Sequence, residues 1–176
     1  MYWEIDPDHT LVEFSVRHLM INIVKGRFSE VQGTIYLDTN QPENSWVKAA
    51  VNAASIYTGN ARRDGHLRSA DFFDAERYPT ISFESMSVQR TGMRSCTVVG
   101  NLTIHGLTRI VGFKVDFTGY AQDPMTKRWA LGMTAIGQVD RRTFHMHFNQ
   151  VLDMGISLID FETGIELRIE AVQVEG

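Results

Sequence analysis

Residues 95–120 read SCTVVGNLTIHGLTRIVGFKVDFTGY, and this stretch decides the fold class. In its first part every second residue from Cys96 to Ile104 is apolar or glycine, and Val111–Phe117 alternate in the same way in the second part. Between the two parts, His105-Gly106 is a turn signal. A period of two residues places successive side chains on opposite faces of a sheet. The stretch therefore predicts two half-buried β-strands joined by a tight turn.

The same alternation recurs in further segments of the chain. Strands are also expected at residues 10–19, 24–37, 46–55, 80–89, 129–139 and 164–174. In the second of these, Phe28 is out of phase with Val31 and Ile35, which predicts a bulge or a bend. Eight long strands without an alternation of strands and helices are typical of an antiparallel barrel or sandwich. The length of the strands and the glycines inside several of them favour the barrel.

Residues 60–78 break the strand pattern. They show no alternation and are rich in Arg, Asp and Ala, which predicts a short helix that begins after Asn60 as its N-cap. A turn then ends the segment at Pro79, because the residue before a proline favours an extended backbone. No linker or repeat interrupts the chain. The predicted fold class is all-β: a single domain over residues 1–176, folded as an eight-stranded antiparallel barrel with one short helix between strands.

Composition excludes several classes of protein. A hydrophobic content of 43% with 22% charged residues excludes a disordered chain, and a single cysteine, Cys96, excludes a disulfide scaffold. The net charge of −4, without any block of Lys and Arg, argues against binding to nucleic acid. The first residues lack the basic and apolar regions of a signal peptide, and no apolar run approaches the ~18 residues of a membrane span. We therefore expect a soluble cytoplasmic protein, or a periplasmic one if a leader was removed.

Several short blocks, arriving in order along the chain, resemble the YceI-like family. These blocks are DPDH at residues 6–9, FSVRHLM at 14–20, ASIYTGN at 54–60, HLRSADFFD at 66–74, YP at 78–79 and GNLTIHGLTR at 100–109. The resemblance implies a lipocalin-like barrel whose interior holds a long isoprenoid chain, such as a polyprenyl phosphate, a polyprenyl pyrophosphate or a quinone tail. It also implies a binding role rather than catalysis. Residues 141–147 and 151–161 depart from the family pattern.

Apolar residues on the inward faces of the expected strands are the candidate lipid contacts. They are Val12, Phe14, Val16, Val31, Ile35, Phe83, Phe113, Phe117, Leu131 and Met133, with His18 on the same face as Phe14 and Val16. Alternation alone fits equally well with side chains that pack against one another as a solid core. The family resemblance favours a cavity. For His18, a buried imidazole with a hydrogen-bond partner is the competing interpretation.

A basic cluster in the expected helix is the candidate headgroup site. Arg62, Arg63, His66 and Arg68 could meet a phosphate or pyrophosphate if the helix lies at the barrel mouth, because the guanidinium fork suits bidentate contact. The alternatives are a solvated face, or Arg68 paired with Asp71 or Asp74 to hold the loop.

No catalytic template and no cofactor motif is present in the sequence. Ser69, His66 and Asp71 superficially resemble a triad, but they are crowded into one short segment, whereas triad members converge from separate elements. His145 and His147 share a side of an extended stretch but lack a third ligand of clear spacing, so we expect no metal. His9 and His105 are expected to stabilise turns.

The leading hypothesis is a carrier or sequestering protein for an isoprenoid lipid, without a cofactor and without nucleic acid. Transient membrane contact and a homodimer to which Trp46 contributes both stay open. The alternatives are an enzyme that acts on a prenyl or quinone substrate in the same pocket, and a solid-core interaction module.

Overall fold

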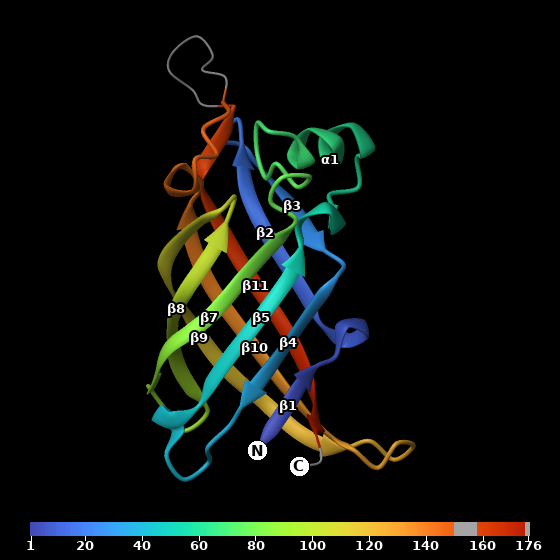
Figure 1. The fold of residues 1–176 in the computed structure, drawn as a ribbon, viewed down its shortest axis with the longest axis vertical. Coiled ribbons are helices and arrows are strands. Elements are labelled where there is room, and N and C mark those ends of the chain that lie inside the picture. The colour runs from blue at the N-terminus through green and yellow to red at the C-terminus, as the bar shows by residue number, and fades with distance from the viewer. Residues whose placement is uncertain (150–157, 175–176) are drawn as a thin grey trace.

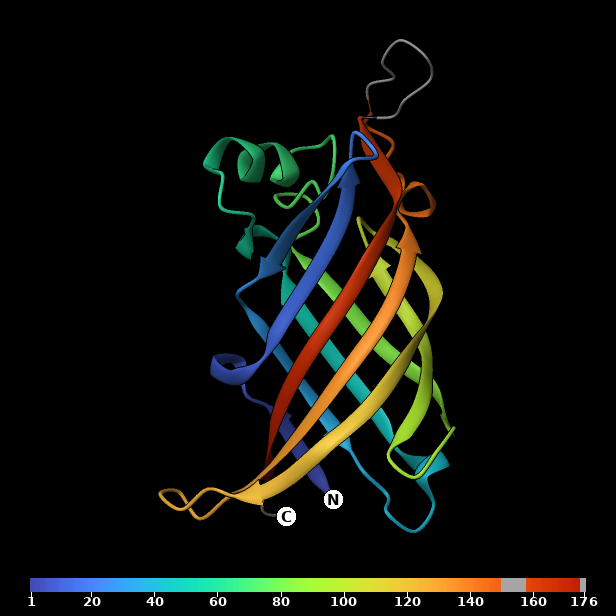
Figure 2. The ribbon, with the colours of Figure 1, turned by 180° about the vertical axis from the view of Figure 1, so that it is seen from behind.

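The strands form one closed antiparallel sheet (Figures 1 and 2). The computed structural model describes residues 1–149 and 158–174. Its strands are β1 (Tyr2–Ile5), β2 (Leu11–His18), β3 (Asn22–Phe28), β4 (Val31–Tyr36), β5 (Trp46–Asn52), β6 (Ile56–Tyr57), β7 (Thr80–Arg90), β8 (Ser95–Ile104), β9 (Leu107–Gln122), β10 (Trp129–Asp140) and β11 (Ile159–Val174). The only α-helix in the described part of the chain is α1 (Ala61–Arg68), and short 3-10 turns at 7–9, 42–44, 53–55 and 141–144 join strands.

Pairing of the first strand with the last closes the barrel. The order runs β1-β4-β5-β7-β8-β9-β10-β11, and Ile5 of β1 lies opposite Ala171 of β11. Strand β11 pairs with β2 along its first half and with β1 along its last residues, so β1 and β2 together fill one strand position of the barrel. In the same way, β3 and β4 together fill the next strand position, and β5 and β6 together fill the one after it. The barrel therefore has eight strand positions, which confirms the predicted fold class.

Local sequence accounts for most of the observed boundaries. The predicted bend within 24–37 is a break at Ser29 and Glu30, between β3 and β4. The Asn60 side chain caps α1 by accepting a hydrogen bond from the Arg63 N–H at 3.0 Å. His105 and Gly106 both have positive φ, at 55° and 73°, as a tight two-residue hairpin turn requires. Strand β1 is only four residues long and escaped prediction.

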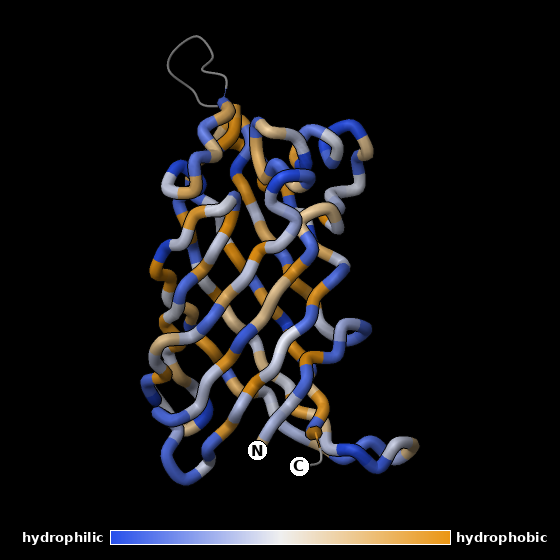
Figure 3. Tube along the Cα trace, in the orientation of Figure 1, coloured by the Kyte–Doolittle hydropathy of each residue, from blue (hydrophilic) through white to orange (hydrophobic). Residues whose placement is uncertain are grey.

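The two ends of the barrel differ. Helix α1 and the β2–β3 hairpin lie at one end, whereas the N-terminus and the end of β11 lie at the other (Figures 1 and 2). Hydrophobic and hydrophilic residues alternate along the barrel strands (Figure 3). None of the helices in the described part of the chain is long and apolar enough to cross a membrane.

Candidate ligand cavity

The barrel encloses a cavity of about 1050 Å³. This volume is at the upper end of the range of ~300–1,000 Å³ that is usual for small-molecule sites. The cavity is lined mainly by apolar side chains of the strands, and residues from both ends of the barrel, Arg62 of α1 and Trp46 at the start of β5, contribute to it. The sequence-predicted contacts that line it are Val12, Phe14, Val16, His18, Val31, Ile35, Phe83, Phe113 and Met133.

Two sequence-predicted contacts lie outside the cavity lining. Leu131 is 1% exposed and packs in a cluster with Trp3 and Ala171 near the end that carries the termini. Phe117 packs against the same cluster. Alternation predicted that both side chains face inward, and both pack within this cluster, but neither borders the cavity.

Two glycines shape the cavity wall, because each leaves room for an aromatic ring to lie against it. A Cβ added at Gly137 would lie 2.7 Å from two ring carbons of Phe113, and one added at Gly26 would overlap the ring of Phe14. Both rings line the cavity. The missing side chains therefore let large rings lie close against the sheet, which leaves more of the interior open.

The basic residues of α1 differ in whether they line the cavity and in whether their side chains already have hydrogen-bond partners. Arg62, Arg63 and His66 line the cavity, whereas Arg68 does not. Arg68 donates from Nε to the Ala54 carbonyl at 2.9 Å and from Nη2 to the Ile56 carbonyl at 3.2 Å. It thus holds the loop, as one alternative anticipated, but through carbonyls rather than carboxylates.

Arg63 also has a structural role. Its Nε donates to the Thr58 hydroxyl at 2.7 Å and its Nη2 to the Thr58 carbonyl at 2.9 Å. The buried carboxylate of Asp64 accepts from the Thr58 N–H at 2.9 Å, so the start of α1 is fixed to the strand before it. Arg62 is exposed and makes no side-chain hydrogen bond or ion pair within the described residues. Of the predicted cluster, Arg62 is therefore the cation left free for an anion.

Aromatic side chains from two separate loops meet at the α1 end of the cavity. His66 contacts the rings of Phe72 and Phe148 at centroid distances of 5.1 and 4.6 Å, and Phe73 contacts Phe28 of β3 at 5.5 Å. The imidazole of His66 also meets Asp71 at 2.7 Å. The loop after α1 and the segment around Phe148 thus cover this end of the barrel together.

Arg141 is a buried cation that the sequence did not single out. It is 4% exposed, and its guanidinium lies 4.5 Å from the ring centroid of Phe161. Four hydrogen bonds run from it to the carbonyls of Met146, Phe148, Ile159 and Asp160, at 2.7 to 3.1 Å. Burial lowers its pKa from the ordinary value. Because its partners are carbonyls rather than carboxylates, its positive charge is not neutralised by an ion pair.

The charges around the cavity are mostly basic. Arg17, His18, Arg62, Arg63, His66 and Arg141 line it, and Glu13 is the only carboxylate among the described lining residues. Glu13 pairs with Lys25 at 3.0 Å. His18 is half-buried and its ring has no hydrogen-bond partner within the described residues, unlike the satisfied core histidine that was its alternative. An anionic or polar headgroup would therefore find its complement at the α1 end.

Trp46 at the start of β5 and Cys96 in β8 are both half-buried. Trp46 is half-buried rather than exposed, because its ring stacks on Tyr36 at 6.1 Å. Cys96 is half-buried beside the cavity, and burial raises the pKa of its thiol. A homodimer to which Trp46 contributes stays open.

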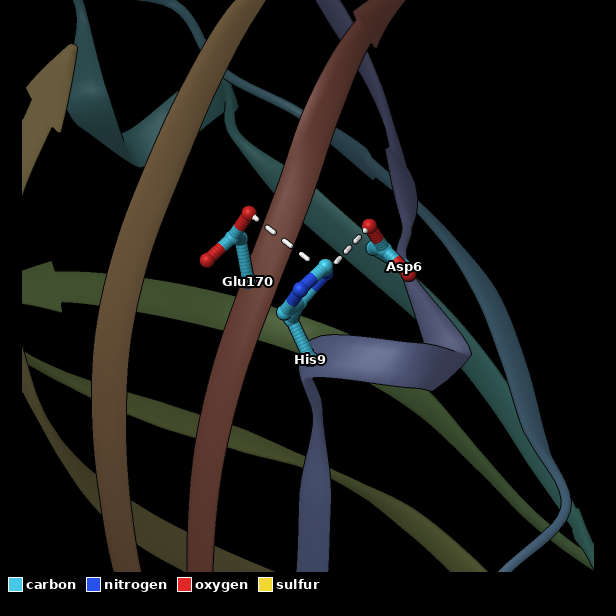
Figure 4. Close-up of side chains that lie close together, drawn as sticks. All are labelled: Asp6, His9 and Glu170. Carbon is cyan, nitrogen blue, oxygen red and sulfur yellow. Dashed lines mark hydrogen bonds and ion pairs between the residues drawn. The ribbon is translucent and has the colours of Figure 1, made fainter. Parts of the chain in front are cut away.

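The sequence-predicted histidine turns are present. His9 Nδ1 lies 2.9 Å from Asp6 Oδ2 and 4.0 Å from Glu170 Oε1 (Figure 4). His105 Nδ1 lies 3.0 Å from the Phe144 carbonyl. Within the described residues, Asp6, His9 and Glu170 are the one group of three side chains with metal-ligating atoms this close together. The Asp6–His9 contact is explained by the turn itself, and the absence of a metal stays a prediction.

The remaining histidine and serine patterns do not assemble a reactive site. The rings of His145 and His147 stack with centroids 5.9 Å apart, and neither belongs to a three-ligand group in the part of the chain that the structure describes. The Ser69 hydroxyl donates to the His66 carbonyl at 2.6 Å rather than to its imidazole. A serine nucleophile activated by His66 is therefore not formed.

The fold and the cavity together define a lipocalin-like antiparallel barrel with an apolar interior. The chain belongs to the YceI-like domain family, which matches residues 3–171. It is 33% identical over 165 residues to a UPF0312 protein of Staphylococcus aureus (strain N315), covering 94% of each chain. It is 34% identical over 162 residues to a UPF0312 protein of Pseudomonas putida (strain F1), covering 89% of this chain and 84% of that one.

Solved structures share the fold. BcnA of Burkholderia cenocepacia superposes with a TM-score of 0.82 at 19% identity, covering 94% of this chain and 98% of that one. A polyisoprenoid binding domain from Saccharophagus degradans, implicated in plant cell wall breakdown, superposes with a TM-score of 0.70 at 11% identity over 98% of both chains. At these identities the likeness establishes the barrel architecture alone.

Proposed function

We propose that this protein binds an isoprenoid lipid in the barrel interior and acts as a carrier or sequestering protein. The observation that carries the proposal is the cavity of about 1050 Å³, walled by apolar strand residues in a barrel of the YceI-like family. The description of the Saccharophagus degradans domain as polyisoprenoid binding supports the same ligand class. The cytoplasm as its location and the lack of a cofactor stay predictions.

Burial of the chain is sufficient to explain affinity without specific hydrogen bonds. A buried methylene contributes about 0.8 kcal/mol, so three isoprene units, with fifteen carbons, contribute roughly 12 kcal/mol before the costs of ordering and association. An adaptable apolar wall, which includes Met133, Phe83 and Phe113, suits a flexible chain. The lipid tail thus provides most of the binding free energy.

The polar end of the lipid is assigned to the α1 end. Arg17 and Arg62 border the cavity there and have no side-chain partner within the described residues. A phosphate or pyrophosphate would pair with these guanidinium groups, and a quinone ring would accept hydrogen bonds from them. The headgroup site thus consists of Arg62 from the predicted cluster and Arg17 from β2.

Native mass spectrometry of protein purified from its own host, before and after organic extraction, tests the proposal. The expected result is an adduct with the mass of an isoprenoid that extraction removes. Ala135→Phe adds a ring to the cavity wall and should lower lipid occupancy, whereas Ile136→Phe, on the outer face of the same strand, should leave it unchanged. Absence of any lipid adduct, or equal occupancy in the two variants, would overturn the proposal.

The alternative, an enzyme that acts on a prenyl or quinone substrate, has one observation in its favour. His18 lines the cavity with its ring unpartnered within the described residues, as a proton-transferring group would be. Turnover of a candidate lipid that disappears in His18→Ala while binding survives would establish it. Binding without turnover in the unsubstituted protein would exclude this role for the lipids tested.

A further inference from the structure

The tip of the β2–β3 hairpin exposes an apolar surface that the barrel does not need. Ile21 is 84% exposed, Met20 51% and Ile23 57%. Only Asn22 is polar between Leu19 and Ile23. Isolated exposed apolar residues are common on soluble proteins, but several together at a projecting turn indicate an interaction site.

The backbone of this turn disfavours the residues that occupy it. The Ile21 N–H donates to the His18 carbonyl at 3.1 Å, and the two residues between them, Leu19 and Met20, have φ of 52° and 60°. Such left-handed positions favour Asn and Gly, because side chains clash there. The β8–β9 turn of this protein does use a glycine, Gly106. Leu-Met at the tip is therefore not explained by the turn geometry.

The hairpin that carries the tip is basic. Residues 17–27 include Arg17, His18, Lys25 and Arg27 and no acidic residue. Arg17 is exposed and has no side-chain partner within the described residues, and neither has Arg62 of α1. The tip and α1 lie at the same end of the barrel (Figures 1 and 2). An apolar tip with unpaired cations beside it complements a surface that is apolar within and anionic outside.

We propose that this tip, Leu19–Ile23, inserts into the surface of an anionic lipid bilayer and presents the α1 end of the cavity to it. The inference depends on the proposed function in one respect: a lipid would enter the cavity at the α1 end. The same strand β2 that leads to the tip lines the cavity with Val12, Phe14 and Val16, so the docked surface is continuous with the cavity wall.

The opposite end of the barrel offers a matched comparison. Met93 and Met125 are 92% and 90% exposed in the hairpin turns there. Met125 lies beside Asp123, whose carboxylate accepts its N–H at 2.8 Å and whose pKa is lowered by that bond. Lys127 and Arg128 follow in the same hairpin, and Met93 lies between Arg90 and Arg94, so this end carries cations as well. Exposed methionines and cations thus occur at both ends, and the β2–β3 tip differs in carrying three consecutive apolar residues, Leu19, Met20 and Ile21.

Sedimentation with vesicles of phosphatidylcholine and phosphatidylglycerol in equal parts tests the inference. The protein should bind these vesicles and bind pure phosphatidylcholine more weakly. Ile21→Asp should reduce partitioning about tenfold or more, which corresponds to loss of one buried isoleucine side chain. Arg17→Gln should reduce it about fivefold, as expected for one cation at an anionic surface. Met93→Asp and Met125→Asp should bind as the unsubstituted protein does.

A second variant covers the case in which Ile21→Asp folds poorly. Leu19→Asn combined with Met20→Gly supplies the residues that the left-handed positions favour, so it should unfold at the same or a higher temperature. It should nevertheless bind the vesicles more weakly. Unchanged binding by this variant and by Ile21→Asp would overturn the inference, as would an equal loss in Met125→Asp, which would assign docking to the other end.

The outcome is separable from that of the proposed function. Ile21 does not line the cavity, so Ile21→Asp loaded with lipid from detergent should keep its lipid adduct in native mass spectrometry. Ala135→Phe should lose the adduct and still bind vesicles. If Ile21→Asp instead converts a dimer to a monomer and vesicle binding is unaffected, the tip is a contact with a second copy and the inference is wrong.

Discussion

Replacement of Arg141 by methionine tests whether carbonyl contacts of one buried cation hold the α1 end of the barrel together. Methionine keeps much of the aliphatic stem but removes all four hydrogen bonds. The Met146 carbonyl is buried, and leaving it without a donor costs about 1–3 kcal/mol. The other three carbonyls are partly buried and contribute about 0.5–1.5 kcal/mol each. The expected loss in the free energy of unfolding is therefore roughly 2.5–7.5 kcal/mol.

The matched control is the neighbouring arginine. Arg142 has a side chain that is 52% exposed and pairs with Asp140 at 2.6 Å, so Arg142→Met should cost about 0–1 kcal/mol. Urea unfolding followed by circular dichroism measures both variants, and Arg141→Met should also lower Tm by about 10 °C, given ~2–4 °C per kcal/mol at this size. Equal losses in the two variants would refute the argument that the buried carbonyl contacts, rather than a charge in this region, stabilise the fold.

Three further predictions concern the wall, the His9 turn and the helix cap. Gly137→Ala should push the Phe113 ring toward the cavity and so lower lipid occupancy. It should also lower the free energy of unfolding by about 1–3 kcal/mol in a urea titration. Gly112→Ala, where the nearest atom to the added Cβ is 3.8 Å away, should be near neutral. The hydrogen bond to Asp6 raises the pKa of His9. The contribution of this pair to stability is therefore present below the unfolded-state pKa of about 6.5 and is lost as pH rises through the folded-state pKa. If Asp6→Asn leaves the NMR titration midpoint of His9 unchanged, this prediction is wrong. Asn60→Ala should cost about 1 kcal/mol in the same unfolding assay, because the Arg63 N–H loses its cap.

The strands could be predicted from sequence wherever one face of a long strand is buried. Strand β8 occupies the predicted residues 95–104 because burial on one face imposes a period of two on its side chains. The phase slip at Phe28 located the break between β3 and β4 for the same reason. Strand β1 escaped because four residues are too few to show a period, and its place is set by pairing with distant residues of β4 and β11.

The sequence predicted which side of each strand faces the barrel interior, but not how far along the barrel each residue lies. Alternation shows which side chains point inward, and Phe113 and Leu131 have the same pattern, yet only Phe113 borders the cavity. How far along the barrel a residue lies depends on strand tilt and register, which one strand's sequence does not contain. Arg141 and the partners of Arg68 were not predicted for another reason: both side chains are held by backbone carbonyls, and any residue type supplies a carbonyl. The one available signal was the Arg141-Arg142 pair where the chain departs from its family's pattern.

Strand β2 links the two proposals physically. Within ten residues the chain passes from the apolar wall at Val12, Phe14 and Val16, through the cation Arg17 and the imidazole of His18, to the apolar tip. A lipid drawn from a bilayer would meet these surfaces in the reverse order, and its charged or polar head would lie beside Arg17 whether the tail was in the membrane or in the barrel. The headgroup then need not cross an apolar barrier during transfer, which would otherwise cost several kcal/mol for an ionised group. On this argument the cations at the α1 end lower the barrier to exchange as well as contributing to affinity.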